Sequence, residues 1–383
     1  MLSPYEPIIR FIREIHGATG PIALHEPSFG PAEEEAVLHC LRSSHVASTG
    51  DYVNRFEEAV SAYTGSPYAI AMVNGTAALH LILVSLGTGS GDLVLTQSLT
   101  FVATVNAIRY TGAQPRYIDI EAGTYGLSPV HLKAWLEENT FTDAQGVPRE
   151  KSTRRRIAAC LPVHAFGIPC RMEELRAVCE PQGIPLVEDA AEALGSFREG
   201  KHAGTFGTAG VLSFNGNKVI TTGGGGMVLT SDPALAEKLR HLSTQARITH
   251  PWEYRHDATG FNYRMPNLNA ALGFAQMQAL EEKLGKKRKL GEAYSKFFAS
   301  RQEQFVDEPP GCHWNHWLNG ILLPGISERD AFLEYARDNR IAARPAWQPI
   351  HLQEKKEGQE AAALPQTMDT YHRLVNLPSS PIP

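Results

Sequence analysis

The sequence predicts an α/β fold, with a mostly parallel central sheet in a large domain and a smaller α/β domain after it. Short apolar runs alternate with helical stretches between residues 68 and 189, which is typical of sheets built from strand–helix–strand units. The chain has 383 residues, 43% of them hydrophobic and 20% charged, enough for a large globular domain plus a smaller one. After the Pro309-Pro310 pair, the pattern changes to one predicted strand, a helix and a second strand, as expected for a smaller domain.

These observations predict two domains. Residues 1–250 would contain an N-terminal segment and the large domain, and residues 251–383 the smaller domain with an interface loop and helices. The N-terminal segment is expected to begin with a short amphipathic helix, because Ile8, Phe11 and Ile12 recur at helical spacing. Helices are also expected from Pro31 to about Ser44 and from Asp51 to about Tyr63.

Composition argues against several classes of function. The net charge is −5 and the one basic cluster, Arg154–Arg156, is short, so no nucleic-acid partner is expected. The five cysteines are scattered and odd in number, which predicts free thiols of a reducing compartment and no metal site. The N-terminus has charges among its apolar residues and is neither a signal peptide nor a membrane span. We therefore expect a cytoplasmic protein with no membrane partner.

The alternating region carries polar residues where predicted strands end. The strands are expected at 68–73, 93–96, 116–120, 157–163 and 185–188, and the intervening helices at about 76–86, 101–110, 129–138 and 172–179. Thr76, Phe101 and Asp189 each lie just past the carboxyl end of a strand. Because ligands of parallel sheets bind at this edge, these three residues are expected to converge on one site.

The stretch from 209 to 230 places a single lysine, Lys218, between two strand-like runs, before four glycines at 223–226. One interpretation is a β-hairpin with a surface lysine. The other is a reactive amine held in a site, with the glycines allowing close backbone approach.

The C-terminal third is predicted to combine helices with two strands. Helices are expected at 233–246, 266–283, 284–300 and 328–339, and strands at 317–323 and 341–347. The segment 247–264 is loop-like and rich in His, Tyr, Trp and Arg, a composition typical of a contact surface.

An acidic residue at a strand end, followed about thirty residues later by a lysine after another strand, is typical of pyridoxal phosphate (PLP) chemistry. Lys218 would form a Schiff base with the cofactor aldehyde, and Asp189 would keep the pyridine nitrogen protonated so that the ring acts as an electron sink. Thr76 at a helix N-terminus would bind the phosphate with Ser213. Phe101 would stack on the ring.

Five stretches resemble the DegT/DnrJ/EryC1/StrS family of sugar aminotransferases, in the family's order over about residues 22–377. They are NGTAAL (74–79), TFVAT (100–104), VEDAAEALG (187–195), SFNGNK (213–218) and GFNYRM (260–265). The combination NGNK…TTGGGGM is most similar to the LegC-like branch, since many relatives carry a Glu among these glycines. That branch makes 4-amino sugars for bacillosamine- and legionaminic-acid-type pathways, which belong to glycan biosynthesis.

The resemblance implies fold type I of the PLP enzymes, like aspartate aminotransferase, and a homodimer with shared active sites at its interface. It implies roles for the cofactor-binding residues Gly75, Thr76, Ala77, Phe101, Asp189, Glu192, Ser213, Lys218 and Asn262. Thr76, Ala77 and Ser213 match phosphate contacts. Asn262 matches an asparagine that reaches the phosphate of the partner subunit's cofactor. Glu192 falls where relatives carry a polar residue near the cofactor's O3, although a surface acid at a helix start is the alternative.

The resemblance also implies the reaction. Dehydratase members carry histidine at the lysine position, so Lys218 favours amino transfer. L-Glutamate would give its amino group to PLP, leaving 2-oxoglutarate and pyridoxamine phosphate (PMP). The acceptor would be a nucleotide-linked 4-keto-6-deoxy hexose, UDP-2-acetamido-2,6-dideoxy-4-hexulose, converted to its 4-amino sugar. GDP- or dTDP-linked 3- or 4-keto sugars are alternatives, as is a non-catalytic PLP-binding regulator.

Contacts with the sugar nucleotide are expected at Ser48, Thr49, Arg264 and His351. His164 is open to two interpretations, a hydrogen-bonded core histidine or a ligand.

Overall fold

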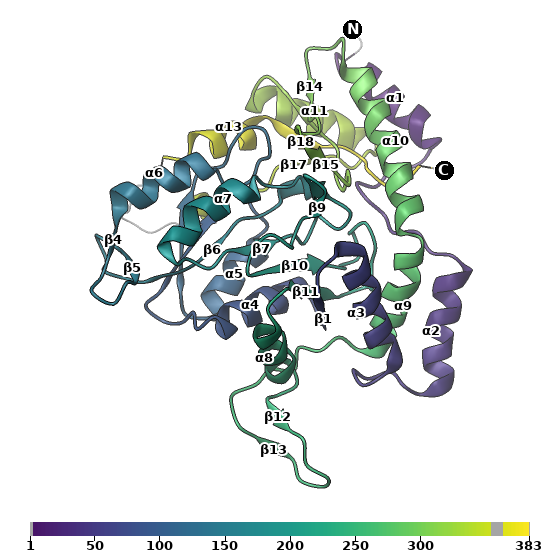
Figure 1. Ribbon diagram of the computed structural model, residues 1–383. Helices are drawn as coiled ribbons and strands as arrows, with labels where there is room; N and C mark the ends of the chain where they lie inside the picture. The colour runs from purple at the N-terminus through teal and green to yellow at the C-terminus, as the bar shows by residue number, and fades with distance from the viewer. Residues whose placement is uncertain (1–2, 354–362, 383) are drawn as a thin grey trace.

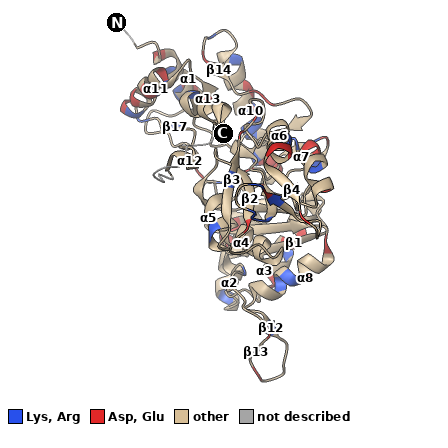
Figure 2. Cartoon of the chain, turned by 90° about the vertical axis from the view of Figure 1, so that its left-hand side faces the viewer, with Lys and Arg blue, Asp and Glu red and all other residues tan. Residues whose placement is uncertain are grey.

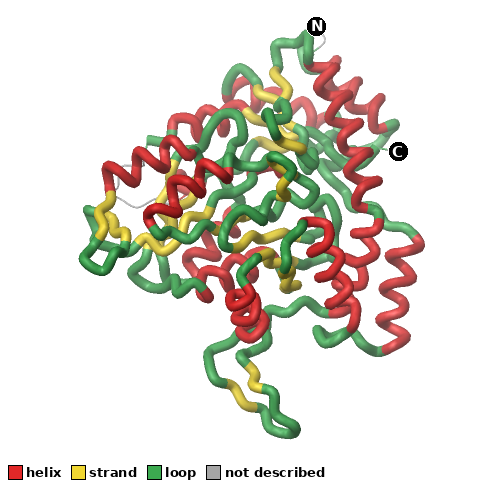
Figure 3. The backbone as a smooth tube through the Cα atoms, in the orientation of Figure 1, coloured by secondary structure: helices red, strands yellow, loops and turns green. Residues whose placement is uncertain are grey.

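A four-stranded and a three-stranded sheet meet at the centre of the protein (Figures 1 and 3). The structure is a computed structural model and describes residues 3–353 and 363–382. The strands are β1 (Tyr68–Met72), β2 (Leu93–Gln97), β3 (Gln114–Ile118), β6 (Ile157–Leu161), β7 (Val187–Asp189), β10 (Ala209–Ser213) and β11 (Gly226–Thr230). The orders β1-β11-β10-β7 and β3-β2-β6 are joined by parallel bridges Cys160–Leu186 and Val163–Asp189. Among these pairings only those of β11 are antiparallel, which confirms the mostly parallel sheet.

Helices cover both faces of this sheet because its strands are apolar on both sides. In β2, Val94 and Leu95 point to opposite faces and enter separate cores. One face carries α4 (Gly75–Ser85), α5 (Val102–Tyr110) and α8 (Pro233–Ser243). The other carries α3 (Asp51–Thr64), α6 (Pro129–Asn139), α7 (Met172–Cys179) and α9 (Asn267–Gln278). The strand–helix alternation predicted between residues 68 and 189 is therefore confirmed.

A smaller antiparallel sheet lies beside the N-terminus (Figure 1). It has the order β14-β16-β18-β17 and comprises β14 (Gln304–Phe305), β16 (Gly320–Leu322), β17 (Arg344–Pro345) and β18 (Leu374–Asn376). Around it lie α1 (Glu6–His16), α10 (Leu280–Phe298), α11 (Ile326–Asp338), α12 (Ile350–Gln353) and α13 (Pro365–Arg373). Ile8 and Ile12 of α1 share a core with Phe332. The N-terminal helix thus packs with the C-terminal part, and a domain boundary near residue 250 stays a prediction.

Two expectations about the C-terminal third were wrong in detail. The strand predicted at 341–347 is limited to Arg344–Pro345, because within that segment only these two residues pair with β18. The two long helices meet at Ala279 rather than after Lys283. Ala279 leaves the helical conformation there although the sequence around it has no glycine or proline break.

Several short elements surround the two sheets. They are α2 (Pro31–Ser43), the hairpin β4 (Thr140–Thr142) with β5 (Pro148–Glu150), the sheet of β8 (Phe197–Arg198), β9 (Lys201–His202) and β15 (Cys312–His313), and single turns of 3-10 helix at Ala165–Gly167 and Glu180–Gln182. The segment predicted to be loop-like forms a hairpin of β12 (Arg247–Ile248) and β13 (Arg255–His256). This hairpin projects from the body in both views (Figures 1 and 2) and exposes Trp252 and Tyr254.

No helix within the described ranges is both long enough and apolar enough to cross a membrane. Acidic and basic residues are scattered over the outer helices (Figure 2).

Candidate active site

A cavity of about 360 Å³ lies at the carboxyl ends of the central strands. Its wall combines strand ends, helix starts and two tryptophans from the C-terminal part. Among its lining residues are Asn74, Gly75, Thr76, Thr100, Phe101, Thr104, Asp189, Glu192, Ser213, Asn217, Lys218, Trp317 and Trp347. Thr76, Phe101 and Asp189 therefore do converge at the strand ends, where parallel sheets bind their ligands.

Asp189 ends β7 and places a buried carboxyl in the cavity wall. The hydroxyl of Thr104 donates to its Oδ2 at 2.7 Å, and the N–H of Ala191 donates to its Oδ1 at 3.2 Å. Burial raises the pKa of Asp189, while the two hydrogen bonds and the charge of Lys218 act in the opposite direction. A protonated ring nitrogen in the cavity would supply the positive partner that favours the ionised carboxylate.

Lys218 reaches the cavity from the connection between β10 and β11. These strands form the predicted antiparallel pair, but the lysine is not a surface residue, because only 13% of its side chain is exposed. Its Nζ lies 3.3 Å from Oε1 of Glu192. Burial raises the pKa of Glu192 to about 7, with the charge of Lys218 opposing this shift. Glu192 is therefore a buried acid facing the lysine rather than a surface acid at a helix start.

The start of α4 forms the end of the cavity that suits an anion. Helix N-termini present backbone N–H groups and a partial positive charge. Asn74 caps this helix by accepting from the N–H of Ala77 at 2.8 Å, so Ala77 lies in the first turn although it does not line the cavity. A Cβ on Gly75 would lie 3.4 Å from Cβ of Ser213, which places the Ser213 hydroxyl beside the helix start.

The glycines after Lys218 allow this crowding. A Cβ on Gly226 would lie 2.6 Å from the carbonyl carbon of Asn74, closer than real Cβ contacts. β11 can therefore approach the cap of α4 only with glycine at this position. Gly225 is surrounded as closely, by Thr222 and Met265, so these two glycines are part of the site's construction, whereas Gly223 and Gly224 have open space around them.

PLP fits this set of residues. The site contains an amine, a buried carboxyl, a helix N-terminus with a hydroxyl beside it, and Phe101, whose side chain lines the cavity and is 57% exposed. These groups match the aldehyde, the ring nitrogen, the phosphate and the ring face of the cofactor, respectively.

The other predicted residues lie outside the cavity wall. Arg264 pairs with Glu57 at 2.8 Å and donates to the carbonyl of Ala71. His351 Nδ1 lies 2.7 Å from the hydroxyl of Ser98. Asn262 is exposed and its backbone bridges to Thr244, away from this chain's cavity.

Ser48 and Thr49 lie in the connection between α2 and α3 and do not line the cavity either. Contacts of Ser48, Thr49, Arg264 and His351 with a sugar nucleotide stay a prediction.

Sequence reasoning missed both tryptophans of the cavity. Trp317 covers Lys218, with its ring centroid 4.2 Å from Nζ. Trp347 stacks on Phe166 with the rings 4.7 Å apart and nearly parallel. Phe166 has a positive φ of 59°, rare for a non-glycine residue, and its N–H donates to Glu192 at 2.9 Å. No sequence signal connects residues that lie so far apart in the chain, although large aromatic residues at the predicted strands 317–323 and 341–347 are a hint.

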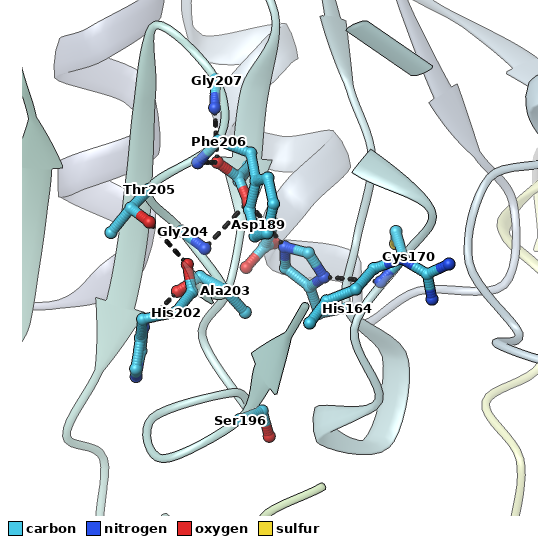
Figure 4. A network of polar contacts seen from close by, with 12 residues as sticks. His164, Cys170, Asp189, Ser196, His202, Ala203, Gly204, Thr205, Phe206 and Gly207 are labelled. Carbon is cyan, nitrogen blue, oxygen red and sulfur yellow. Dashed lines mark hydrogen bonds and ion pairs between the residues drawn. The ribbon is translucent and has the colours of Figure 1, made fainter. Parts of the chain in front are cut away.

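His164 is a core histidine (Figure 4). Its Nδ1 accepts from the N–H of Cys170 at 2.9 Å, so the ring proton lies on Nε2, which is 3.0 Å from Glu188. The carboxylate of Glu188 also accepts from the N–H groups of Gly204, Phe206 and Gly207. This network lies behind the cavity wall and includes no group that lines it.

Comparison with known proteins identifies the family. The sequence profile of the DegT/DnrJ/EryC1/StrS aminotransferase family matches residues 27–382. The chain belongs to this family. EpsN of Bacillus subtilis (strain 168), a candidate pyridoxal phosphate-dependent aminotransferase, is 39% identical over 87% of this aminotransferase and 83% of its own length. A GDP-perosamine synthase of Escherichia coli O157:H7 is 34% identical over 94% and 93% of the two chains.

A solved structure agrees with the fold. The aminotransferase TlmJ from Streptoalloteichus hindustanus superposes with a TM-score of 0.85 at 27% identity, covering 94% of this chain and 93% of its own. The predictions of fold type I, of a PLP-dependent sugar-nucleotide aminotransferase and of PLP as the cofactor are therefore confirmed. The roles of individual site residues, the homodimer, the LegC-like branch and the particular sugar stay predictions.

Proposed function

We propose that this aminotransferase moves an amino group from L-glutamate to C4 of UDP-2-acetamido-2,6-dideoxy-4-hexulose in the cytoplasm. The observation that carries the amino-transfer step is the position of Lys218, whose amine faces the buried carboxyl of Glu192 in the same cavity as Asp189. When bound, PLP supplies an aldehyde that captures amines and a ring that delocalises an electron pair.

Different residues of the chain have different roles in this reaction. Asp189 holds a proton on the ring nitrogen, because its buried carboxylate is stabilised by a positive partner. Lys218 removes and returns the proton at the carbon next to the transferred nitrogen as general acid and base. The start of α4 and the hydroxyls of Thr76 and Ser213 orient the phosphate, and Phe101 packs on the ring face.

We further propose a homodimer in which Asn262 contacts the cofactor phosphate of the partner subunit. Its exposed position away from this chain's cavity supports such a role, as does the projecting hairpin of β12 and β13, which exposes Trp252 and Tyr254. Exposed aromatic residues are typical of surfaces that become covered by a partner.

Two observations support different nucleotides. The similarity of NGNK…TTGGGGM to the LegC-like branch supports a UDP-linked acetamido sugar. The relative named GDP-perosamine synthase supports a GDP-linked sugar. A panel of UDP-, GDP- and dTDP-linked 3- and 4-keto sugars, each incubated with the holoenzyme and L-glutamate, distinguishes them by the mass of the amino sugar formed. A GDP-sugar preferred in kcat/KM would overturn the UDP assignment and leave the amino transfer intact.

The amino transfer itself is tested with Lys218→Ala. We expect loss of 2-oxoglutarate formation, because no other residue is proposed to move this proton. Lys238→Ala is the matched control, since Lys238 lies on α8 and donates to the carbonyl of Ser85 away from the cavity. A Lys218→Ala protein that turned over glutamate and keto sugar at the wild-type rate would refute the proposal.

A further inference from the structure

Trp317 covers Lys218 although it comes from the C-terminal part of the chain. It is 3% exposed, lines the cavity and places its ring 4.2 Å from the lysine Nζ. An ammonium group over an indole face at this distance is attracted by the ring's electrons. Trp317 and Glu192 thus contact the same amine, one through its ring face and the other through a carboxyl oxygen at 3.3 Å.

The ring is anchored to the lysine's own loop. The indole N–H donates to the carbonyl of Asn217 at 2.8 Å, and that carbonyl belongs to the peptide bond that precedes Lys218. The backbone N–H of Trp317 donates to the side chain of Asn315 at 2.8 Å. The indole is therefore fixed relative to the backbone from which Lys218 extends.

Lys287 of α10 holds Trp317 from behind. Its side chain is fully buried, and its Nζ donates to the carbonyls of Trp317 at 3.2 Å and Ser379 at 2.6 Å. Burial lowers the pKa of Lys287, and its amine donates to both of these carbonyls. Such a buried amine links three separate segments of the chain at the position of Trp317.

We propose that Trp317 is a positioning residue, whose indole face, anchored to Asn217 and Lys287, directs the Lys218 amine toward the carbon with which it reacts. A lysine side chain has four rotatable stem bonds, and Glu192 alone would draw the amine to one wall of the cavity. The ring contact restricts this freedom. The proposal rests on the proposed role of Lys218.

The test separates covalent capture of the cofactor from its binding. In capture, Nζ forms a C=N bond with the aldehyde carbon of PLP, while the aldehyde oxygen leaves as water with the two amine protons. PMP carries an amine in place of the aldehyde and forms no bond with Lys218. The full-length chain, freed of cofactor, is mixed with PLP and the absorbance change gives the capture rate. The Kd for PMP is measured on the same protein.

We expect Trp317→Leu to slow capture by about tenfold or more, as misplacement of a reacting group does, with a change in PMP Kd below about twofold. Trp317→Phe keeps a ring face, and we expect it to recover most of the rate. If Trp317→Leu captures PLP at the wild-type rate, or loses capture and PMP binding equally, the proposal is overturned. Should Trp317→Leu fail to fold, a Trp317→Phe protein that is as slow as Lys218→Ala overturns it as well.

Trp347→Leu is the matched control, because Trp347 also lines the cavity but stacks on Phe166. Slowing of capture in this variant to the extent seen with Trp317→Leu would assign the effect to cavity shape and overturn the proposal. Borohydride reduction and peptide mass spectrometry then locate the linked lysine. Linkage away from Lys218 refutes the proposed function, whereas linkage at Lys218 with an unaltered rate in Trp317→Leu refutes only this inference.

Discussion

Glu188 and Asp189 are consecutive residues of β7, and both carboxyls are buried. Because neighbouring side chains of a strand point to opposite faces, Glu188 points into the network behind the site, whereas Asp189 lines the cavity. Glu188 accepts three backbone N–H bonds and one from His164. Asp189 accepts bonds from Thr104 and Ala191.

The two residues illustrate how a buried carboxyl serves either structure or chemistry. A carboxylate with four donors is fully hydrogen-bonded, so removing its charge leaves donors without a partner. A carboxyl with two donors keeps acceptor capacity for a ligand, and burial raises its pKa until a positive partner arrives. Substituting each acid by its amide keeps the shape and isolates this difference.

The largest expected effect is on the stability of Glu188→Gln. The new NH₂ group would face the N–H of Gly204 or the Nε2–H of His164, and donor would meet donor. We expect the free energy of unfolding to fall by about 3 kcal/mol, measured by urea denaturation of the full chain. A loss below about 1 kcal/mol would show that the four hydrogen bonds are not what Glu188 contributes.

Asp189→Asn should show the opposite pattern. The Thr104 hydroxyl can rotate to accept from the new NH₂ group, and the buried charge is removed. The free energy of unfolding should therefore change by less than about 1 kcal/mol. Amino transfer should fall about a hundredfold or more, because the ring nitrogen loses its negative partner. Rates of 2-oxoglutarate formation measure this. Equal activity in Asp189→Asn and the wild type would refute the role of Asp189.

The sequence predicted the elements around these two acids well. Strands of β-branched and apolar residues alternating with helices determine a parallel sheet, and the edge at which Asp189 and Lys218 meet follows from chain direction. Short strands such as β4 and β5 escaped prediction because the polar stretch around them has no apolar period.

The part of the site that could not be predicted depends on contacts between distant segments. Trp317 reaches Lys218 only because a buried lysine and a carbonyl hold it there. The donors to Glu188 are backbone N–H groups, which every residue except proline has and which therefore leave no mark in a sequence. The ion pair of Arg264 with Glu57 joins side chains about two hundred positions apart, and nothing in the sequence indicates that they meet.

Glu192 is a third buried acid, which accepts from the N–H of Phe166 and faces the Lys218 amine. Its protonation should make the stability of the protein depend on pH. Burial raises its pKa from 4.5 to about 7, so between these values the folded protein binds more protons than the unfolded chain. This contribution to stability is full below pH 4.5 and is lost as pH rises to about 7. Glu192→Gln lacks this loss.

Relative to the wild type, Glu192→Gln should gain stability across this window, by at most about 3 kcal/mol, because the pKa of Glu192 rises from 4.5 in the unfolded chain to about 7 in the folded protein. Unfolding free energies of the cofactor-free proteins at several pH values between 4.5 and 8 provide the comparison. A stability difference that stays constant with pH would contradict a raised pKa at Glu192.

The smallest expected effect is that of Thr104→Val, which removes one of the two donors to Asp189. The Asp189 carboxyl then keeps one donor, whereas that of Glu188 has four. The hydroxyl of Thr104 also bonds that of Thr100 at 2.7 Å, so the change loosens the carboxyl without removing its charge. We expect activity to fall about fivefold and stability by about 1 kcal/mol. Thr96→Val is the matched control, since this buried hydroxyl donates to the carbonyl of Leu161. Thr96→Val should lose a similar amount of stability while its activity stays at the wild-type level. If the two variants lose activity equally, the hydrogen bond from Thr104 to Asp189 has no specific part in the reaction.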